Sequence, residues 1–259
     1  QLKYCVKART KMYNSWLTGA RRGRKGLLSA RRLLHRKNIL VNSKHSKLSI
    51  KSNIYYPIFL DITKKPCLVV GGGRVAERKV SVLLKFNGII RLVSPQISNT
   101  LKRYGDKGRI HISLKEYGEE DLDGVALVFA ATNVESLNER IYNDAVKKNI
   151  PANVVDNPSL CDFIVPSIVK KDPIIIAIST SGMLPFLSKR LRKDMAEGIT
   201  RDYVRYANIV GRLRKLLIME IKDKKLRQSL MKEIMGTDVS VINNMGFKKA
   251  KETFFGSEK

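Results

Sequence analysis

The chain has 259 residues, of which 43% are hydrophobic, so it can build the core of one large domain or of two modest ones. No apolar run approaches the roughly 18 residues of a membrane-spanning helix, and we expect a soluble, cytoplasmic protein. Its three cysteines and three histidines are too few and too scattered for a disulfide framework, a His/Cys metal site or a Ser-His-Asp triad.

The net charge of +27 is concentrated at the N-terminus. Residues 1–52 contain 15 Lys and Arg and no Asp or Glu, whereas the rest of the chain contains 35 basic and 23 acidic residues. An Arg-rich, acid-free segment is typical of a targeting peptide, and it also suits an arm that neutralises the phosphates of nucleic acid. A basic extension without a specific role is the third interpretation. We predict that residues 1–52 lie outside the fold, and that any contact with nucleic acid is confined to them.

Residues 57–156 alternate between strand and helix patterns. Continuous apolar runs indicate strands that are buried on both faces, and apolar residues at helical spacing indicate helices packed against them. The predicted strands are 66–70, 89–94, 109–115, 125–132 and 151–156, after a short extended segment at 57–62. The predicted helices are 75–86, 97–104 and 134–149. This alternation predicts an α/β fold with a parallel, doubly wound sheet of the Rossmann type.

The pattern changes after residue 156. Two apolar runs, 163–169 and 173–179, flank a Lys-Lys-Asp-Pro turn, which predicts a pair of antiparallel strands. A helical region begins near Pro185, and apolar residues at helical spacing through 203–221 predict a helix with one buried face. The weakly patterned residues 236–259 are expected to form a tail.

Three consecutive glycines follow the first predicted strand. Gly71, Gly73 and Ala76 match the pattern G-x-G-x-x-G/A between a strand and a helix. In this pattern the first glycine allows a sharp turn, the second lets a diphosphate approach the backbone, and the third small residue lets helix and strand pack closely. The helix N-terminus then offers N–H groups to the phosphates. A tight glycine turn without a ligand is the alternative.

Two further positions flank the predicted ligand crevice. A carboxylate that binds the ribose of NAD is expected about 20 residues after the glycines, but the second strand ends there at Ser94-Pro95. Ser94 can still make one hydrogen bond to a ribose. Thr132 and Asn133 end the fourth strand, where they border the crevice or form the N-cap of the next helix.

Five segments together resemble one known family, that of precorrin-2 dehydrogenase and sirohydrochlorin ferrochelatase, which forms the N-terminal region of siroheme synthases. They are PIFLDITKKPCLVVGGGRVAERKVSVLL, FAATNVESLNERI, NVVDNP, FIVPSIV and IAISTSGMLPFLSKRLR. The resemblance covers about residues 55–200 in order, and the combination is far more specific than any one motif.

Membership would imply the NAD-dependent oxidation of precorrin-2 to sirohydrochlorin in siroheme biosynthesis. Some members also insert ferrous iron, and members form a homodimer across the strand pair. The resemblance therefore implies a Rossmann domain followed by a dimerisation strand pair and a helical domain. The expected divisions are a basic extension at 1–52, an NAD-binding Rossmann domain at 53–157, a dimerisation strand pair at 158–182, a helical domain at 183–235 and a tail at 236–259.

The resemblance also implies roles for single residues. Asp156 ends the Asn-Val-Val-Asp motif and matches the family's candidate catalytic carboxylate, which would accept a proton at the mouth of the sheet. Its alternative role is to cap the turn that follows. The expected cofactor-binding residues are Gly71, Gly72, Gly73, Arg74, Val75, Ala76, Ser94, Pro95, Thr132 and Asn133.

The implied substrate is a tetrapyrrole that carries eight carboxylates, and the net charge of +12 outside residues 1–52 suits such a ligand. Lys189, Arg190 and Arg192 are candidate carboxylate contacts, with a solvated helix face as the alternative. A different class of function is a non-catalytic NAD-sensing module, since Rossmann units also serve in regulation.

Overall fold

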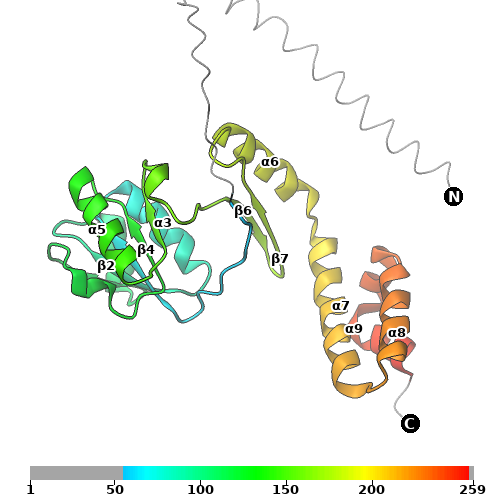
Figure 1. The fold of residues 1–259 in the computed structure, drawn as a ribbon. Helices are drawn as coiled ribbons and strands as arrows, with labels where there is room; N and C mark the ends of the chain where they lie inside the picture. The colour runs from blue at the N-terminus through cyan, green and yellow to red at the C-terminus, as the bar shows by residue number, and fades with distance from the viewer. Residues whose placement is uncertain (1–54, 257–259) are drawn as a thin grey trace, which may run out of the picture. The chain divides into compact units, whose positions relative to one another are not determined.

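The computed structural model describes residues 55–256 (Figure 1). The predicted basic extension at 1–52 lies outside the described residues. Between residues 55 and 256, no helix is both long enough and apolar enough to cross a membrane.

A parallel sheet of five strands forms the first part of the described chain. Its strands, in chain order, are β1 (Pro66–Val70), β2 (Ile89–Val93), β3 (His111–Ser113), β4 (Leu127–Ala130) and β5 (Ala152–Val154). Their spatial order is β3-β2-β1-β4-β5, and every pair is parallel. The chain therefore starts in the middle of the sheet, builds one half, and then crosses back to build the other. The predicted α/β fold with a doubly wound sheet is confirmed.

Helices cover both faces of this sheet (Figure 1). The helices are α3 (Arg74–Leu84), α4 (Asn99–Asp106) and α5 (Glu135–Lys147), with a short 3-10 turn, η1 (Glu119–Leu122). One core cluster lies between the sheet and α3 and α4, and a second lies between the sheet and α5 and η1. The sheet is therefore buried on both sides, which is why its strands are continuously apolar in sequence.

Alternate residues of the central strands supply the two cores. In β1, Cys67 and Val69 belong to the α3 and α4 side, whereas Leu68 and Val70 belong to the α5 side. All four are essentially inaccessible to solvent. Burial of each Leu or Val side chain stabilises the fold by about 1.5–3 kcal/mol. Burial also raises the pKa of the Cys67 thiol to about 11, so this cysteine is an uncharged core residue near neutral pH.

The segment 57–62, expected to be extended, forms no strand. It is not part of the five-stranded sheet, and Ile58, Phe59 and Leu60 expose more than half of their surface. Of this run, Ile62 alone belongs to the core, where it packs on the side of α3. An apolar run predicts a strand only if a neighbouring strand offers free backbone groups, and here β1 is already paired with β2 and β4.

A separate antiparallel pair follows the sheet. Its strands are β6 (Ser167–Lys171) and β7 (Ile174–Ile178), with Val169 opposite Ile176. The helix α6 (Pro185–Gly198) begins with the predicted proline. A short 3-10 turn, η2 (Pro158–Leu160), lies between β5 and this pair. The strand pair predicted from the two apolar runs is confirmed.

Three helices form the last part of the described chain: α7 (Arg201–Glu220), α8 (Lys224–Gly236) and α9 (Val239–Phe255). They share one core, to which α7 contributes Leu213 and Leu217, and α9 contributes Ile242, Ala250 and Phe254. The expected tail at 236–259 is therefore wrong for Val239–Phe255. The backbone of α9 is interrupted at Gly246, where φ is +69°. This kink puts the apolar residues before and after it out of helical phase, which hid the helix in the sequence.

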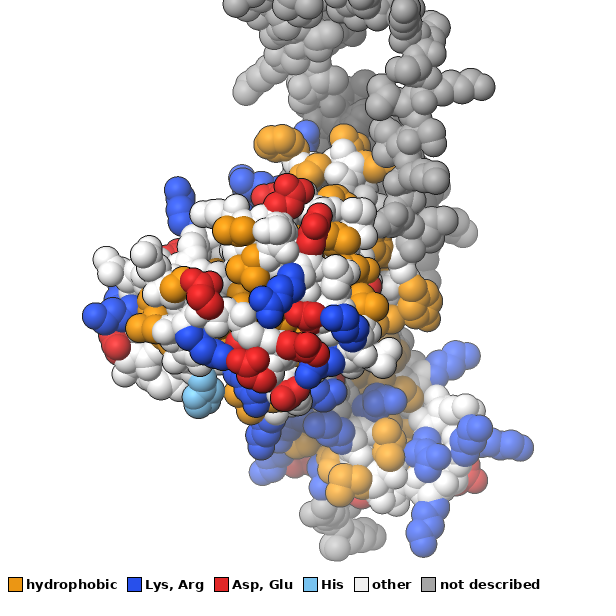
Figure 2. Space-filling model, turned by 60° about the vertical axis from the view of Figure 1, so that its left-hand side comes forward, with side chains coloured by type: hydrophobic (Ala, Val, Ile, Leu, Met, Phe, Trp, Pro, Cys, Tyr) orange, Lys and Arg blue, Asp and Glu red, His pale blue; other side chains and the backbone are white. Residues whose placement is uncertain are grey.

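Charge is distributed differently over the sheet and over the last three helices. Residues 55–157 contain 15 Lys and Arg and 12 Asp and Glu, and Figure 2 shows the two signs interspersed on their surface. Residues 201–259 contain 14 basic and seven acidic residues. The basic surplus of the described chain therefore lies mainly on α7–α9 and not around the sheet.

Candidate active site

The glycine loop lies where the strand order of the sheet reverses. The carboxyl ends of β1 and β4 are neighbours, with Val70 paired to Ala130, and the chain leaves β1 directly into Gly71. Gly71 has φ +119°, and a Cβ there would overlap the carbonyl oxygen of Ala131. Gly71 is therefore required for the turn itself and for the close approach of β4. Open α/β sheets bind their ligands at this kind of reversal point.

Gly72 and Gly73 meet different surroundings. A Cβ on Gly72 would overlap the carbonyl oxygen of Gln96 and lie 2.9 Å from the Cα of Ile97. The Gly72 carbonyl also accepts the Ser98 N–H at 2.9 Å, so the loop after β2 lies directly on Gly72. A Cβ on Gly73 would meet nothing within 4 Å. The third glycine therefore leaves a patch of bare backbone that faces open space.

The helix α3 begins at this bare backbone. Gly73 is its N-cap, and no side chain caps the first turn. The first N–H groups of a helix have no partner inside it, so they are available to an anion. Ala76 is fully buried against the sheet, as the close packing of helix and strand requires. Arg74 is exposed beside this turn, and Val75 is partly buried.

The loop after β2 uses its serine internally. Ser94 is buried, and its hydroxyl donates to the Gln96 carbonyl at 2.7 Å. Its N–H donates to the Ser113 carbonyl at the end of β3. The hydroxyl proton of Ser94 is therefore occupied, although the oxygen retains lone pairs for a ribose hydroxyl. Pro95 and Gln96 are exposed at this edge. Gln96 was not singled out from the sequence, and its main chain is what packs on the glycine loop.

Thr132 organises the turn between β4 and α5. Its hydroxyl donates to the Asn138 side-chain oxygen at 2.8 Å, and Asn138 returns a hydrogen bond to the Thr132 carbonyl at 3.0 Å. Thr132 also accepts the Val134 N–H, and Val134 is the N-cap. Asn133 is therefore not the N-cap of α5, and it is exposed beside the crevice. Asn138 is buried and was missed in the sequence because it looks like one more polar helix residue.

Asp156 lies just beyond β5, at the same edge of the sheet as the glycine loop. It is exposed and has φ +61°, a left-handed conformation that Asp and Asn tolerate better than most residues. The chain then forms η2 and returns beside β5, where Cys161 bridges to Asn153. Asp156 therefore occupies the tip of a short loop, residues 153–163, whose two ends lie side by side.

A polar network at the base of this loop was not foreseen. Lys79 of α3 donates to the side-chain oxygen of buried Asn153 at 3.0 Å, and its ammonium lies 4.6 Å from the centre of the Phe129 ring. The Asn153 side-chain nitrogen donates to the Phe163 carbonyl at 2.8 Å. Two signals in the sequence pointed to it: a lysine one turn after Ala76 on the buried side of a helix, and an asparagine inside an apolar strand.

The candidate substrate contacts lie on α6. Lys189 and Arg190 are exposed and Arg192 is partly buried. Ser188 beside them is buried and hydrogen-bonds Thr180. These three basic residues are therefore on an element that packs on the strand pair.

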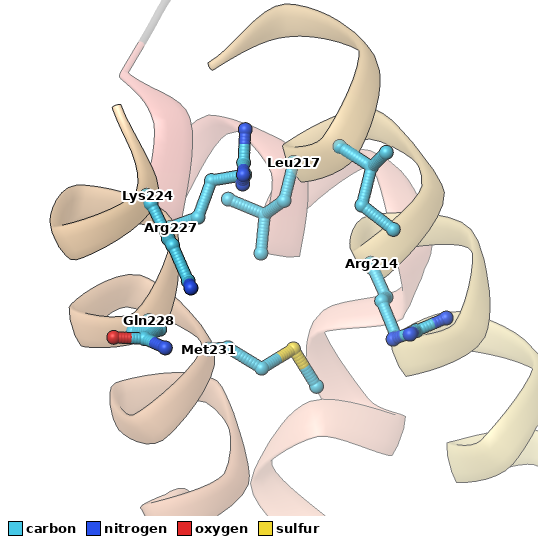
Figure 3. A pocket seen from close by; sticks show the side chains of 7 residues that line it. Arg214, Leu217, Lys224, Arg227, Gln228 and Met231 are labelled. Carbon is cyan, nitrogen blue, oxygen red and sulfur yellow. The ribbon is translucent and has the colours of Figure 1, made fainter. Parts of the chain in front are cut away.

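A hollow lies between α7 and α8, with a volume of about 250 Å³. Figure 3 shows cationic and apolar side chains around it, among them Arg214, Lys224 and Leu217. The guanidinium of Arg227 at its rim donates to the carbonyls of Ile221 and Lys222, which directly follow α7. This hollow contains no acid or nucleophile, and the chemistry is better supported at the edge of the sheet. No cluster of three metal-ligating side chains occurs among residues 55–256.

Comparison with known proteins gives three findings. A family model described as "Putative NAD(P)-binding" matches residues 58–167. A siroheme synthase of Vesicomyosocius okutanii subsp. Calyptogena okutanii (strain HA) is 39% identical over 175 residues, which are 66% of this chain and 37% of that protein. Siroheme synthase 1 of Serratia proteamaculans (strain 568) is 40% identical over 160 residues, 62% of this chain and 34% of that protein. The chain spans little more than a third of the length of these curated relatives.

A solved structure decides the assignment. SirC, a precorrin-2 dehydrogenase, superposes with a TM-score of 0.63 at 26% identity, over 78% of this chain and 97% of SirC. The chain belongs to the precorrin-2 dehydrogenase family. The resemblance inferred from the sequence motifs is confirmed.

The residues of this precorrin-2 dehydrogenase family member fit a nicotinamide dinucleotide. The open backbone at Gly73, where a Cβ would fill empty space, faces the same edge as the uncapped start of α3. Together they can accept a diphosphate, and the family match supplies the nicotinamide class of the ligand. The predicted nicotinamide cofactor is confirmed at this level.

Proposed function

We propose that the protein is an NAD-dependent precorrin-2 dehydrogenase that oxidises precorrin-2 to sirohydrochlorin. One observation carries the proposal: Gly73, with its open backbone, and Asp156 lie at the carboxyl edge of one parallel sheet. The family assignment supplies the substrate class, because siroheme synthases and SirC are the relatives of this chain.

The chain's own residues would hold the dinucleotide at its diphosphate. The N–H groups of Arg74 and Val75 at the start of α3 would donate to the phosphates above Gly73. Thr132 and Asn133, at the end of β4, would border the nicotinamide half, since β4 is the next strand across the reversal point.

NAD is favoured over NADP by the loop after β2. This loop reads Ser94, Pro95, Gln96, Ile97, Ser98, and it contains no lysine or arginine to pair with a second phosphate on the ribose. NADP-binding folds usually place an arginine there. Ser94 and the exposed Pro95 would instead contact an unmodified ribose.

Asp156 is the residue that would act on the substrate. Oxidation removes a hydride and a proton from adjoining atoms of the macrocycle, and the electron pair left by the proton forms the new double bond. A nicotinamide bound at the sheet edge would supply the acceptor for the hydride. The Asp156 carboxylate would accept the proton, since it lies at the tip of the loop that follows β5 at the carboxyl edge of the sheet.

Lys189, Arg190 and Arg192 on α6 would contact carboxylates of the substrate. Three cations within four positions of one helix suit a ligand with eight carboxylates, and two of the three are exposed. Replacing all three by glutamine should raise the KM for precorrin-2 about tenfold or more and leave the affinity for NAD unchanged. An unchanged KM would mean that these three residues do not contact the substrate and only form a solvated face of α6.

An anaerobic assay tests the proposed function directly. Purified protein is mixed with precorrin-2 and either NAD or NADP, and sirohydrochlorin is followed by its absorbance. Product with NAD supports the proposal, and product with NADP alone overturns the choice of cofactor. No product with either, together with tight NAD binding, favours the non-catalytic sensing module instead.

Ferrous iron would be a substrate in a second activity, insertion into sirohydrochlorin. Asp156 is the residue to which we assign it, because a carboxylate near the macrocycle can accept the protons that iron displaces. The same assay with ferrous ion tests this: siroheme formed by the wild-type protein above the rate without protein supports it, and an equal rate rules it out.

We propose a homodimer across β6 and β7, for which the partly exposed face of this strand pair is the candidate interface. A two-stranded sheet is marginal by itself. Residues paired across the strands share a face, so Ile175 and Lys170 lie on the side opposite buried Val169. Ile175→Glu should therefore convert a two-chain particle into single chains at micromolar concentration, measured by light scattering. Lys170→Gln on the same face should not, and a two-chain mass for Ile175→Glu would contradict the interface.

A further inference from the structure

The loop that carries Asp156 is closed at its base by one side chain. Asn153, the middle residue of β5, donates from its side-chain nitrogen to the Phe163 carbonyl at 2.8 Å and toward the Cys161 sulfur at 3.4 Å. Two further hydrogen bonds join the same two ends. The Ala152 N–H donates to the Asp162 side-chain carboxylate at 2.9 Å. The Asp162 N–H returns a bond to the Ala152 carbonyl at 2.9 Å. The position of the loop tip therefore depends on the contacts that fix the Asn153 side chain.

Lys79 fixes the side chain of Asn153 by a hydrogen bond. The ammonium of Lys79 donates to the remaining polar atom of the amide, its oxygen, at 3.0 Å. The lysine comes from α3, the helix that begins at the bare backbone of Gly73, and the two residues are 74 positions apart in sequence. Lys79 therefore links the helix that would hold the diphosphate to the loop that carries Asp156.

The ammonium of Lys79 is partly buried among groups of α3 and of the loop. Burial lowers the pKa of its ammonium, the positive charge of Arg78 on α3 acts in the same direction, and the negative charge of Asp156 on the loop opposes them. Burial also raises the pKa of the Cys161 thiol, so the thiol is uncharged near neutral pH. Within residues 55–256 no carboxylate lies within ion-pair distance of Lys79. Its stabilising contacts are the amide of Asn153 and the face of Phe129.

A half-buried cation without an ion pair is a costly choice for a fold alone. A methionine of similar length would fill the same space against Phe129 without desolvating a charge. What the ammonium adds is a directional bond that orients the Asn153 amide, so that its nitrogen points to Phe163 and Cys161. The Cys161 sulfur in turn lies 3.2 Å and 3.3 Å from the carbonyl oxygens of Val154 and Asn157, which flank Asp156.

We propose that Lys79 is a positioning residue for Asp156, acting through Asn153 and Cys161 to fix the loop in which the carboxylate faces the dinucleotide crevice. This inference rests on the proposed function for its effect on turnover, but the closure of the loop is a property of the protein without substrate.

Two measurements on the full chain test the inference, with three variants. Lys79→Met removes the charge and the hydrogen bond, Lys79→Arg retains both, and Lys102→Met makes the same change at an exposed lysine of α4. Amide hydrogen exchange is followed for the amides of Ala152 and Asp162. Steady-state turnover of precorrin-2 with NAD is measured in parallel.

For Lys79→Met we expect the Ala152 and Asp162 amides to exchange at least tenfold faster, with the amides of β1 and β2 unchanged. We expect kcat to fall about 10- to 100-fold, because a carboxylate displaced by about 1 Å loses its alignment. The KM for precorrin-2 and the Kd for NAD should stay within about threefold. Lys79→Arg should restore kcat to within about threefold of the wild type, and Lys102→Met should match the wild type throughout.

The outcomes separate the two proposals. If Lys79→Met leaves loop exchange unchanged, the positioning role is wrong, whatever the wild type catalyses. If exchange accelerates over the whole sheet and Lys79→Arg restores nothing, Lys79 is a packing residue only. If the wild type makes no sirohydrochlorin while the loop amides respond as expected, the proposed reaction fails and the role of Lys79 in closing the loop stands.

Discussion

Gly73→Ala is expected to lower the affinity for NAD about 10- to 100-fold, which is about 1.4–2.8 kcal/mol, and to leave the fold intact. Gly73 has extended backbone angles, φ −90° and ψ −171°, that any residue adopts, and a Cβ there would meet nothing within 4 Å. The new methyl group would instead occupy the space in which a diphosphate must lie against the backbone. Titration calorimetry with NAD and thermal unfolding of the same preparation would measure both quantities.

Gly72→Ala is the matched comparison. Its Cβ would overlap the main chain at Gln96, so the loop after β2 would have to move, and we expect a loss of about 1–3 kcal/mol of folding stability. Gly72 is thus needed for the fold without ligand, whereas Gly73 is needed only when the dinucleotide binds. Wild-type NAD affinity in Gly73→Ala would mean that no diphosphate lies on this backbone.

Asp156→Asn is expected to lower kcat for precorrin-2 oxidation about 10²- to 10⁴-fold, the usual contribution of a positioned proton acceptor. Asparagine is the suitable replacement because it tolerates the positive φ at this position, whereas alanine would add backbone strain. The affinity for NAD should stay within about threefold, since the diphosphate site is built from β1 and α3. Steady-state rates and NAD titrations on one preparation check both.

The control for this variant is Asp106→Asn. Asp106 is exposed at the end of α4, a helix that runs away from the carboxyl edge of the sheet, so the same chemical change there should not alter turnover. Full activity of Asp156→Asn would remove the proton-accepting role and leave Asp156 as a turn residue.

The sheet could be predicted because its strands are buried on both faces. A strand such as β4 needs apolar residues for both cores, Leu127 and Phe129 for one and Val128 and Ala130 for the other, so it appears as an uninterrupted run. The glycine loop was recognised for a related reason, since three glycines between a strand and a helix have few other uses. Local sequence was sufficient wherever the cause of the structure was local.

Other features depend on contacts that the local pattern does not contain. The run at 57–62 is apolar, but it pairs with no strand of the sheet. The helix α9 is hidden by the change of phase at Gly246. The hydrogen bond from the Ser94 hydroxyl to the Gln96 carbonyl also depends on the path of the folded loop. The Lys79–Asn153 pair joins two motifs that were each noticed separately, and only the fold brings them together.

The wedging of Gly71 against β4 and of Gly72 against the loop after β2 has a thermodynamic consequence. Main chain confined on both sides has little conformational entropy left to lose, so the ordering of this segment is completed during folding and not during association. The dinucleotide would meet a preorganised receptor, and most of its interaction energy would remain available as affinity.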